Sequence, residues 1–230
     1  MSTAGAEIVR IAPAGDSALL LEFPQRIDPV INARAILLAE RLRRRCGTAV
    51  RDAVVGYATV TVYFDPLVVD AAWLEAEMRD AVLAPDDAPT AAATATEVPV
   101  CYDAELGPDL ADVAAFGGLA AEDVIALHAG AEYRVYMVGF VPGFAYMAPV
   151  DPRIAAPRRS SPRRSVPMGS VAIAGLQTGI YPAVTPGGWN IVGRTPLKPY
   201  DPSRRNPLLF RPGDRVRFRP ISREIYDRTR

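Results

Sequence analysis

A single glycine- and proline-rich segment, residues 169–196, holds the polar side chains whose types and spacing best suit ligand chemistry. Short apolar runs such as Val171–Ala174 predict strands, and the glycines and prolines between them predict sharp turns. Strands and turns of this kind can form the wall of a small barrel, where backbone approaches a ligand closely. Gln177 lies between two glycines, where its amide is suited to bond either a carbonyl in a cleft or nearby backbone.

Three aromatic side chains in or near this segment are candidates for lining a pocket: Tyr146, Tyr181 and Trp189. Aromatic residues in a small barrel also serve as core, because each buries a large apolar area. The sequence leaves both roles open for these three residues.

A second candidate region is the arginine-rich stretch at residues 153–164, which places five arginines beside Ser160 and Ser161. A guanidinium group binds a carboxylate or a phosphate through two parallel hydrogen bonds. A ligand with such an anionic group needs side chains of this kind. The alternative is a basic loop that simply faces solvent.

His128 is the only histidine and therefore the only candidate for imidazole acid–base chemistry. No Ser-His-Asp or Cys-His signature surrounds it, and a structural, hydrogen-bonded histidine is the alternative. Cys46 and Cys101 form no CxxC pair, which predicts reduced thiols. Since the chain has no His/Cys cluster, we predict no metal site within it.

The net charge of zero hides a division along the chain. Residues 1–138 carry 10 basic and 21 acidic residues, a net charge of −11, whereas residues 139–230 carry 16 basic and 5 acidic residues, a net charge of +11. The basic half favours an anionic ligand, nucleic acid or an acidic partner, unless both halves simply face solvent or each other. Nucleic acid ranks lowest, because no RNA-binding aromatic motif is present.

The elements that must position these residues fall into two parts. In the first part, Asp28 and Asp70 each precede apolar residues at helical spacing and are expected to cap two helices. Paired strands are expected between the helices, and Trp73 is expected in the core. Strands, helix, two strands and helix in this order predict a small ferredoxin-like α+β domain over residues 1–84.

The second part begins after residues 85–96, which have little hydrophobic pattern and predict a linker. Residues 139–214 hold 13 of the 22 prolines and 9 of the 17 glycines, yet apolar strand-like runs recur among them. A β-barrel with long irregular loops over residues 97–230 fits this pattern better than disorder.

The pattern of hydropathy predicts a soluble, cytoplasmic protein. No apolar run reaches the ~18 residues that a membrane-spanning helix needs, and the first residues lack the basic-then-apolar pattern of a signal peptide. The P-loop pattern is also absent, so if the protein uses ATP, it does not bind it through a P-loop.

Motifs spread over essentially the whole chain occur together in one family. They are PAGDSALL at 13–20, GFVPGFAYM at 139–147, PRR at 157–159, SPR at 161–163, VP at 166–167, the run at 169–182, PGGW at 186–189, GRTP at 193–196, YDP at 200–202 and PGDRVRF at 212–218. The combination resembles the family that contains KipI, allophanate hydrolase subunit 1 and the B subunit of bacterial 5-oxoprolinase.

The resemblance implies an α+β domain followed by a cyclophilin-like β-barrel domain. It also implies a partner chain, of the type of the 5-oxoprolinase C subunit or of allophanate hydrolase subunit 2, together with a third component. Such complexes open 5-oxo-L-proline to L-glutamate with ATP, and this chain alone is expected to be inactive.

A site for that reaction must hold a carboxylate, orient an amide and stabilise phosphoryl charge. The resemblance indicates this region, and from the chemistry of the reaction we expect Arg158, Arg163 and Arg194 to bind anions, Gln177 to orient the lactam and His128 to move a proton.

Two alternatives stay open. The substrate of the amide chemistry can be allophanate, or the protein can bind a sensor histidine kinase and inhibit it, as the name KipI implies. The arginines and Gln177 favour a small anionic ligand over a pure interaction surface.

Overall fold

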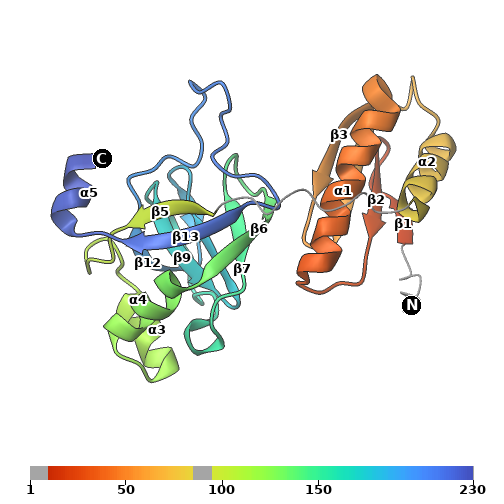
Figure 1. The fold of residues 1–230 in the computed structure, drawn as a ribbon. Helices are drawn as coiled ribbons and strands as arrows, with labels where there is room; N and C mark the ends of the chain where they lie inside the picture. The colour runs from red at the N-terminus through yellow and green to blue at the C-terminus, as the bar shows by residue number, and fades with distance from the viewer. Residues whose placement is uncertain (1–9, 85–94, 230) are drawn as a thin grey trace. The chain divides into compact units, whose positions relative to one another are not determined.

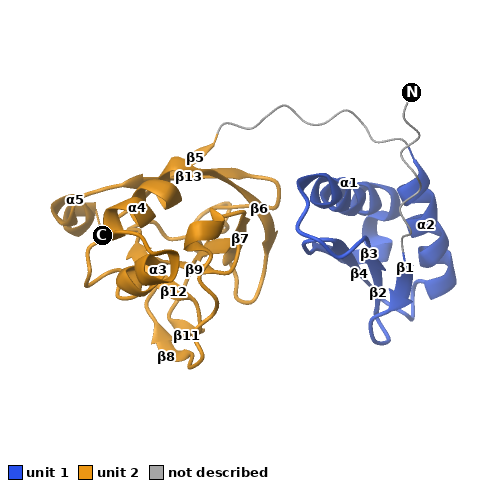
Figure 2. Ribbon diagram, turned by 90° about the horizontal axis from the view of Figure 1, so that it is seen from below, with its two compact units in different colours: residues 1–91 blue, residues 92–230 orange. Residues whose placement is uncertain are grey.

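The structure, a computed structural model, describes residues 10–84 and 95–229. The chain divides into two compact units, residues 1–91 and 92–230, each with its own hydrophobic core (Figure 2). The predicted linker falls at residues 85–96, of which 85–94 lie outside the described residues. In the parts of the chain that are described, no helix combines the length and apolar character needed to cross a membrane.

The first unit is a four-stranded antiparallel sheet in the order β1-β2-β4-β3, with both helices on one of its faces (Figure 1). Its elements are β1 (Arg10–Pro13), β2 (Ala18–Glu22), α1 (Pro29–Cys46), a 3-10 turn (Gly47–Ala49), β3 (Val50–Val55), β4 (Thr59–Phe64) and α2 (Ala71–Leu83). The mixed α and β composition is confirmed. The chain order is ββαββα, whereas the ferredoxin-like order is βαββαβ, so that assignment stays a prediction.

Both helices of this unit begin where the sequence predicts. Asp28 and Asp70 each accept hydrogen bonds from two backbone amides of the first helical turn, groups that have no partner within the helix. The prediction that Trp73 lies in the core is wrong, because its side chain is 44% exposed. Helix α2 instead buries Leu74 and Met78 against the sheet.

The second unit is built on a seven-stranded sheet in the order β12-β9-β10-β7-β6-β13-β5. All neighbouring strands are antiparallel except β13 and β5. The strands are β5 (Thr96–Val100), β6 (Glu132–Val138), β7 (Ala145–Ala148), β9 (Ser170–Ala174), β10 (Gln177–Ile180), β12 (Asn190–Arg194) and β13 (Arg215–Pro220).

The two edges of this sheet meet. Cys101, directly after β5, and Arg194 of β12 exchange two backbone hydrogen bonds of 2.9 Å each. These bonds bring the seven strands close to a closed barrel, in which part of the edge that an open sheet would expose is paired. The predicted β-barrel architecture is therefore confirmed in its coarse form.

Two helices and a small hairpin complete the barrel unit. Helix α3 (Leu110–Gly117) packs on β12, and helix α4 (Ala121–Gly130) packs on β13 and on α3 (Figure 1). A separate antiparallel pair, β8 (Arg163–Val166) and β11 (Thr185–Gly187), carries the end of the arginine-rich stretch.

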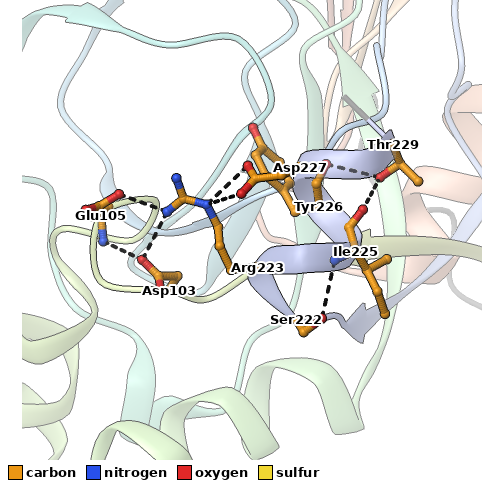
Figure 3. Close-up of polar contacts among 8 residues, drawn as sticks. All are labelled: Asp103, Glu105, Ser222, Arg223, Ile225, Tyr226, Asp227 and Thr229. Atoms are coloured by element: carbon orange, nitrogen blue, oxygen red, sulfur yellow. Dashed lines mark hydrogen bonds and ion pairs between the residues drawn. The ribbon is translucent and has the colours of Figure 1, made fainter.

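The last element, α5 (Arg223–Thr229), is tied to the loop after β5 by ion pairs (Figure 3). Arg223 lies 2.8 Å from Glu105 and 3.5 Å from Asp103, and it also pairs with Asp227 one turn along its own helix. Hydrogen bonds to Glu105 and Asp227 raise the pKa of the Arg223 guanidinium above its usual range. All four side chains are exposed, so each contact is expected to contribute little to stability.

Candidate functional site

One face of the seven-stranded sheet collects several of the sequence-predicted residues. In β9, Val171 and Ile173 belong to the barrel core, so the alternate residues lie on the outer face. Residues paired across antiparallel strands share a face. The outer face therefore carries Gln177, Tyr146 and Arg194, through the pairs Gln177–Ala174, Tyr146–Gly179 and Arg194–Ser170.

An aromatic cluster covers the middle of this outer face. The Phe144 ring lies edge-on to four others, with centroid distances of 4.7 Å to Tyr146, 5.1 Å to Tyr181, 5.4 Å to Trp189 and 5.9 Å to Phe140. Edge-to-face contacts of this kind add to the energy of area burial. Tyr181 and Trp189 are almost fully buried, and Tyr146 is partly exposed. Of the three predicted pocket residues, only Tyr146 offers much surface to a ligand.

Gly179 in β10 has no side chain, which allows the Phe144 ring to pack directly against the sheet. A Cβ atom built on Gly179 would lie 3.1 Å from the Phe144 ring and 2.9 Å from the Ala145 carbonyl oxygen. The neighbouring Gln177 is in a strand, and its amide has no hydrogen bond among the described residues. It is therefore free to meet a ligand, although its predicted role in orienting the lactam stays a prediction.

Arg158 approaches the cluster from the arginine-rich stretch. Its guanidinium lies over the Trp189 ring, 5.9 Å from the centroid, a cation–π contact. Within the described part of the chain its side chain has no ion pair or hydrogen bond. Burial raises the pKa of the nearby Tyr146 hydroxyl, and the charge on Arg158 opposes this shift. Arg158 thus offers an uncompensated positive charge at the edge of the aromatic cluster.

Arg163, in contrast, already binds a carboxylate of the protein. Its two terminal nitrogens each lie 2.8 Å from an oxygen of Asp109, the two-pronged geometry expected for an external anion. Arg159 adds a contact of 2.7 Å to the same carboxylate. The structure therefore gives Arg163 a structural partner, and its predicted role in binding a ligand anion stays a prediction.

Sequence reasoning missed Asp109, although it is 2% exposed and lies at the centre of this network. It immediately precedes α3, where an aspartate commonly caps the helix, yet its carboxylate bonds no amide of the helix. A signal that could have pointed to it is the excess of arginines at 153–164, because any of them that folding buries needs a carboxylate partner.

Arg194 is the other predicted anion-binding residue without a protein counter-charge. Its side chain makes no ion pair with any described residue, and its Nε is buried without a hydrogen-bond partner. The hydroxyl of Ser170, its partner across the strands, is likewise buried without one. Gly169 beside them has a φ of 81°, and a Cβ there would lie 2.4 Å from the Thr195 carbonyl oxygen.

His128 lies on the opposite, core side of the sheet. Its ring nitrogens are 2.8 Å from the Tyr102 hydroxyl and 2.9 Å from the Thr178 hydroxyl, and its ring stacks on Phe218. Thr178 pairs with the core residue Ile173, so it points away from the face that carries its neighbour Gln177. Burial lowers the pKa of His128 to about 3. This environment favours a structural role, and the predicted proton transfer stays a prediction.

The buried state of His128 predicts a pH-dependent stability. Its folded pKa of about 3 lies below the usual 6.5, so the unfolded chain binds a proton that the folded chain does not. Stability is therefore lost as the pH falls below 6.5, by up to about 1.4 kcal/mol per pH unit from this group. We expect His128→Gln to flatten the dependence between pH 6.5 and 4.5, measured by urea unfolding. Equal slopes for the two proteins would show that His128 is protonated in the fold.

No metal site is visible in the described ranges, where no group of three or more His, Cys, Asp or Glu side chains is arranged to hold an ion. The uncompensated groups on the outer face are arginines and an amide, which suit an anionic organic ligand.

Comparison with known sequences gives one family and several close relatives. The family described as "Carboxyltransferase domain, subdomain C and D" matches residues 9–210. The B subunit of 5-oxoprolinase from Bacillus subtilis is 39% identical, over 94% of this chain and 95% of that protein. The B subunit of 5-oxoprolinase from Escherichia coli O157:H7 is 40% identical, over 90% and 93% of the two chains.

Solved structures agree with this similarity. Protein PH0987 of Pyrococcus horikoshii is 39% identical, with a TM-score of 0.56, over 94% of this chain and 100% of that one. The protein TTHA0988 is 40% identical with a TM-score of 0.80, and this chain spans 41% of its length. The urea amidolyase of Kluyveromyces lactis shares the fold at 21% identity, with a TM-score of 0.80 over 96% of this chain and 15% of the amidolyase.

Proposed function

We propose that this chain, which belongs to the family of KipI and the 5-oxoprolinase B subunit, is a subunit of a 5-oxoprolinase. The family model that matches it describes subdomains C and D of a carboxyltransferase domain. The observation that carries the proposal is the similarity, over nearly the full length, to three proteins named as that B subunit. We propose that the complex hydrolyses 5-oxo-L-proline to L-glutamate with a C-type partner subunit, together with a third component.

The chemistry of the substrate fits the uncompensated groups of the barrel. 5-Oxoproline carries a carboxylate and a lactam amide, so its recognition requires a cation and an amide-binding group. Arg158 offers the cation beside Trp189, and Gln177 on the outer face offers an amide without a hydrogen bond among the described residues. We assign the substrate carboxylate to Arg158 and the lactam to Gln177, with Tyr146 as the exposed aromatic neighbour.

We place the use of ATP at the level of the complex. When bound there, ATP would supply the activation of the lactam carbonyl oxygen, since an unactivated amide is a poor electrophile. This chain has no P-loop, and its contribution would be positive charge from Arg194, which has no protein counter-charge among the described residues. Such a group stabilises developing phosphoryl charge by positioning and electrostatics.

We also propose a fold for each of the two units and a cellular location for the protein. If β1 is counted last, the first unit reads βαββαβ, so we propose a circularly permuted ferredoxin-like domain over residues 1–84. We propose a cyclophilin-like barrel over residues 97–230 and a cytoplasmic location, where ATP is available.

The test is the hydrolysis of ATP by this chain purified with a C-type partner subunit plus the third component. We expect hydrolysis to rise with 5-oxoproline and not with allophanate. Stimulation by allophanate alone would favour the allophanate hydrolase alternative. A rate of ATP hydrolysis that neither substrate changes would contradict the proposal and leave inhibition of a histidine kinase as the function to test.

A further inference from the structure

The backbone around Arg158 is held on both sides by the turn that carries Trp189. The side-chain amide of Asn190 donates a hydrogen bond of 2.8 Å to the carbonyl oxygen of Pro157. The amide of Arg159 donates one of 2.8 Å to the carbonyl oxygen of Gly188. Arg158 is the residue between these two attachments, so its backbone is held beside the turn that carries the indole ring.

The second attachment extends to a buried carboxylate. Asp109 accepts four hydrogen bonds, from Arg159 at 2.7 Å, twice from Arg163 at 2.8 Å, and from the amide of Ile191 at 2.7 Å. The Asp109 amide in turn donates to the Ile191 carbonyl oxygen at 2.9 Å. Asp109 therefore joins the arginine-rich stretch to β12, the strand that follows Trp189.

We propose that Asp109 is a positioning residue, which holds the Arg158 guanidinium over Trp189 so that this one arginine receives the carboxylate of the substrate. The inference rests on the proposed function for the identity of that carboxylate. Asp109 itself is buried and would not touch the ligand.

Ion pairing distinguishes Arg158 from its neighbours Arg159 and Arg163 as the residue available to an external anion. Arg159 and Arg163 share the negative charge of Asp109, whereas Arg158 has no carboxylate partner among the described residues. The carboxylate also occupies hydrogen-bond donors of Arg159 and Arg163 that would otherwise compete for the same anion. Of these three arginines, the network thus leaves only Arg158 with a guanidinium that meets no carboxylate among the described residues.

The kinetic test uses the assembled complex with 5-oxoproline, at a temperature where every variant is folded. We expect Arg158→Ala to raise KM roughly 10- to 100-fold, the usual effect of losing a hydrogen bond to a charged group. Asp109→Asn is expected to raise KM in the same direction, with little change in kcat. The double variant is expected to add no more than about twofold to the effect of Arg158→Ala, because both changes remove one interaction.

Opposite outcomes overturn the proposal. A lower KM in Asp109→Asn would mean that the released Arg159 and Arg163 bind the substrate themselves. Multiplied effects in the double variant would mean that Asp109 acts independently of Arg158. Arg159→Ala removes the side-chain contact of residue 159 with Asp109, while its backbone hydrogen bond to Gly188 and the pairing of Arg163 with Asp109 remain. It is expected to raise KM even if Asp109→Asn does not fold. The matched control is Arg164→Ala, which removes an exposed arginine without an ion pair among the described residues.

A spectroscopic test separates this inference from the proposed function. Trp73 and Trp189 are the only tryptophans, so Trp73→Phe leaves Trp189 as the sole emitter. Loss of a cation close to the indole ring changes the electric field on it. We expect Arg158→Ala and Asp109→Asn to shift the emission in the same direction, and Arg164→Ala to leave it unchanged. Emission of Asp109→Asn equal to that of the parent would overturn the positioning role, whether or not the complex hydrolyses 5-oxoproline.

Discussion

Asp109→Ala is expected to lower the free energy of unfolding of the barrel unit by about 3–5 kcal/mol. The carboxylate is almost fully buried and accepts three hydrogen bonds from arginines and one from a backbone amide. Its removal leaves Arg163 without a counter-charge, Arg159 with only the exposed Asp112 at 3.8 Å, and the Ile191 amide without its side-chain acceptor. The cost of that uncompensated charge exceeds the net value of the intact network.

The matched control for this prediction is Asp112→Ala on the same helix. Asp112 lies 3.8 Å from Arg159, but its side chain is 71% exposed, so its loss is expected to cost at most about 0.5 kcal/mol. Urea unfolding followed by Trp189 emission in the Trp73→Phe background reports on the barrel unit alone. Similar midpoints for the two variants would mean that the Asp109 network contributes no more than a surface ion pair.

Phe144→Ala is expected to cost the same unit about 3–5 kcal/mol, the range for a buried aromatic residue replaced by alanine. Phe144 is 2% exposed and is the ring that Tyr146, Tyr181 and Trp189 all contact. The cavity would lie on the outer face, between the sheet and the remaining rings, where the backbone of Gly179 and Ala145 cannot collapse into it. We therefore also expect the Trp189 emission to change in the folded variant.

Phe140→Ala is the control for the aromatic cluster. Phe140 also contacts the Phe144 ring edge-on, but its side chain is 62% exposed and buries little area. Its loss is expected to cost less than about 1 kcal/mol. Comparable losses for Phe140→Ala and Phe144→Ala in urea unfolding would contradict a cluster centred on Phe144.

Local sequence signals predicted the elements that depend on local chemistry. Asp28 and Asp70 cap their helices because an aspartate just before an apolar helical pattern can satisfy the first free amides. The alternating strands and dense turns after residue 139 likewise predicted a barrel. Gln177 lies on the outer face because successive side chains of a strand point to opposite faces, and this two-residue alternation can be followed in the sequence.

Features that depend on distant parts of the chain could not be predicted in this way. Asp109 meets Arg163 across 54 positions, so no local pattern shows that this arginine is already paired. His128 is the only histidine, which suggested chemistry, but α4 turns it into the core beside Phe218. Helical spacing predicts Trp73 together with Leu74 and Met78, but α2 buries Leu74 and Met78 and leaves Trp73 44% exposed.

The measurement that tests the account most directly is the formation of L-glutamate from 5-oxo-L-proline by the complex reconstituted with and without this chain. We predict that glutamate forms only with the chain present, and that Arg158→Ala raises KM roughly 10- to 100-fold while Arg164→Ala does not. Glutamate formation without the chain, or an unchanged KM in Arg158→Ala, would contradict the account.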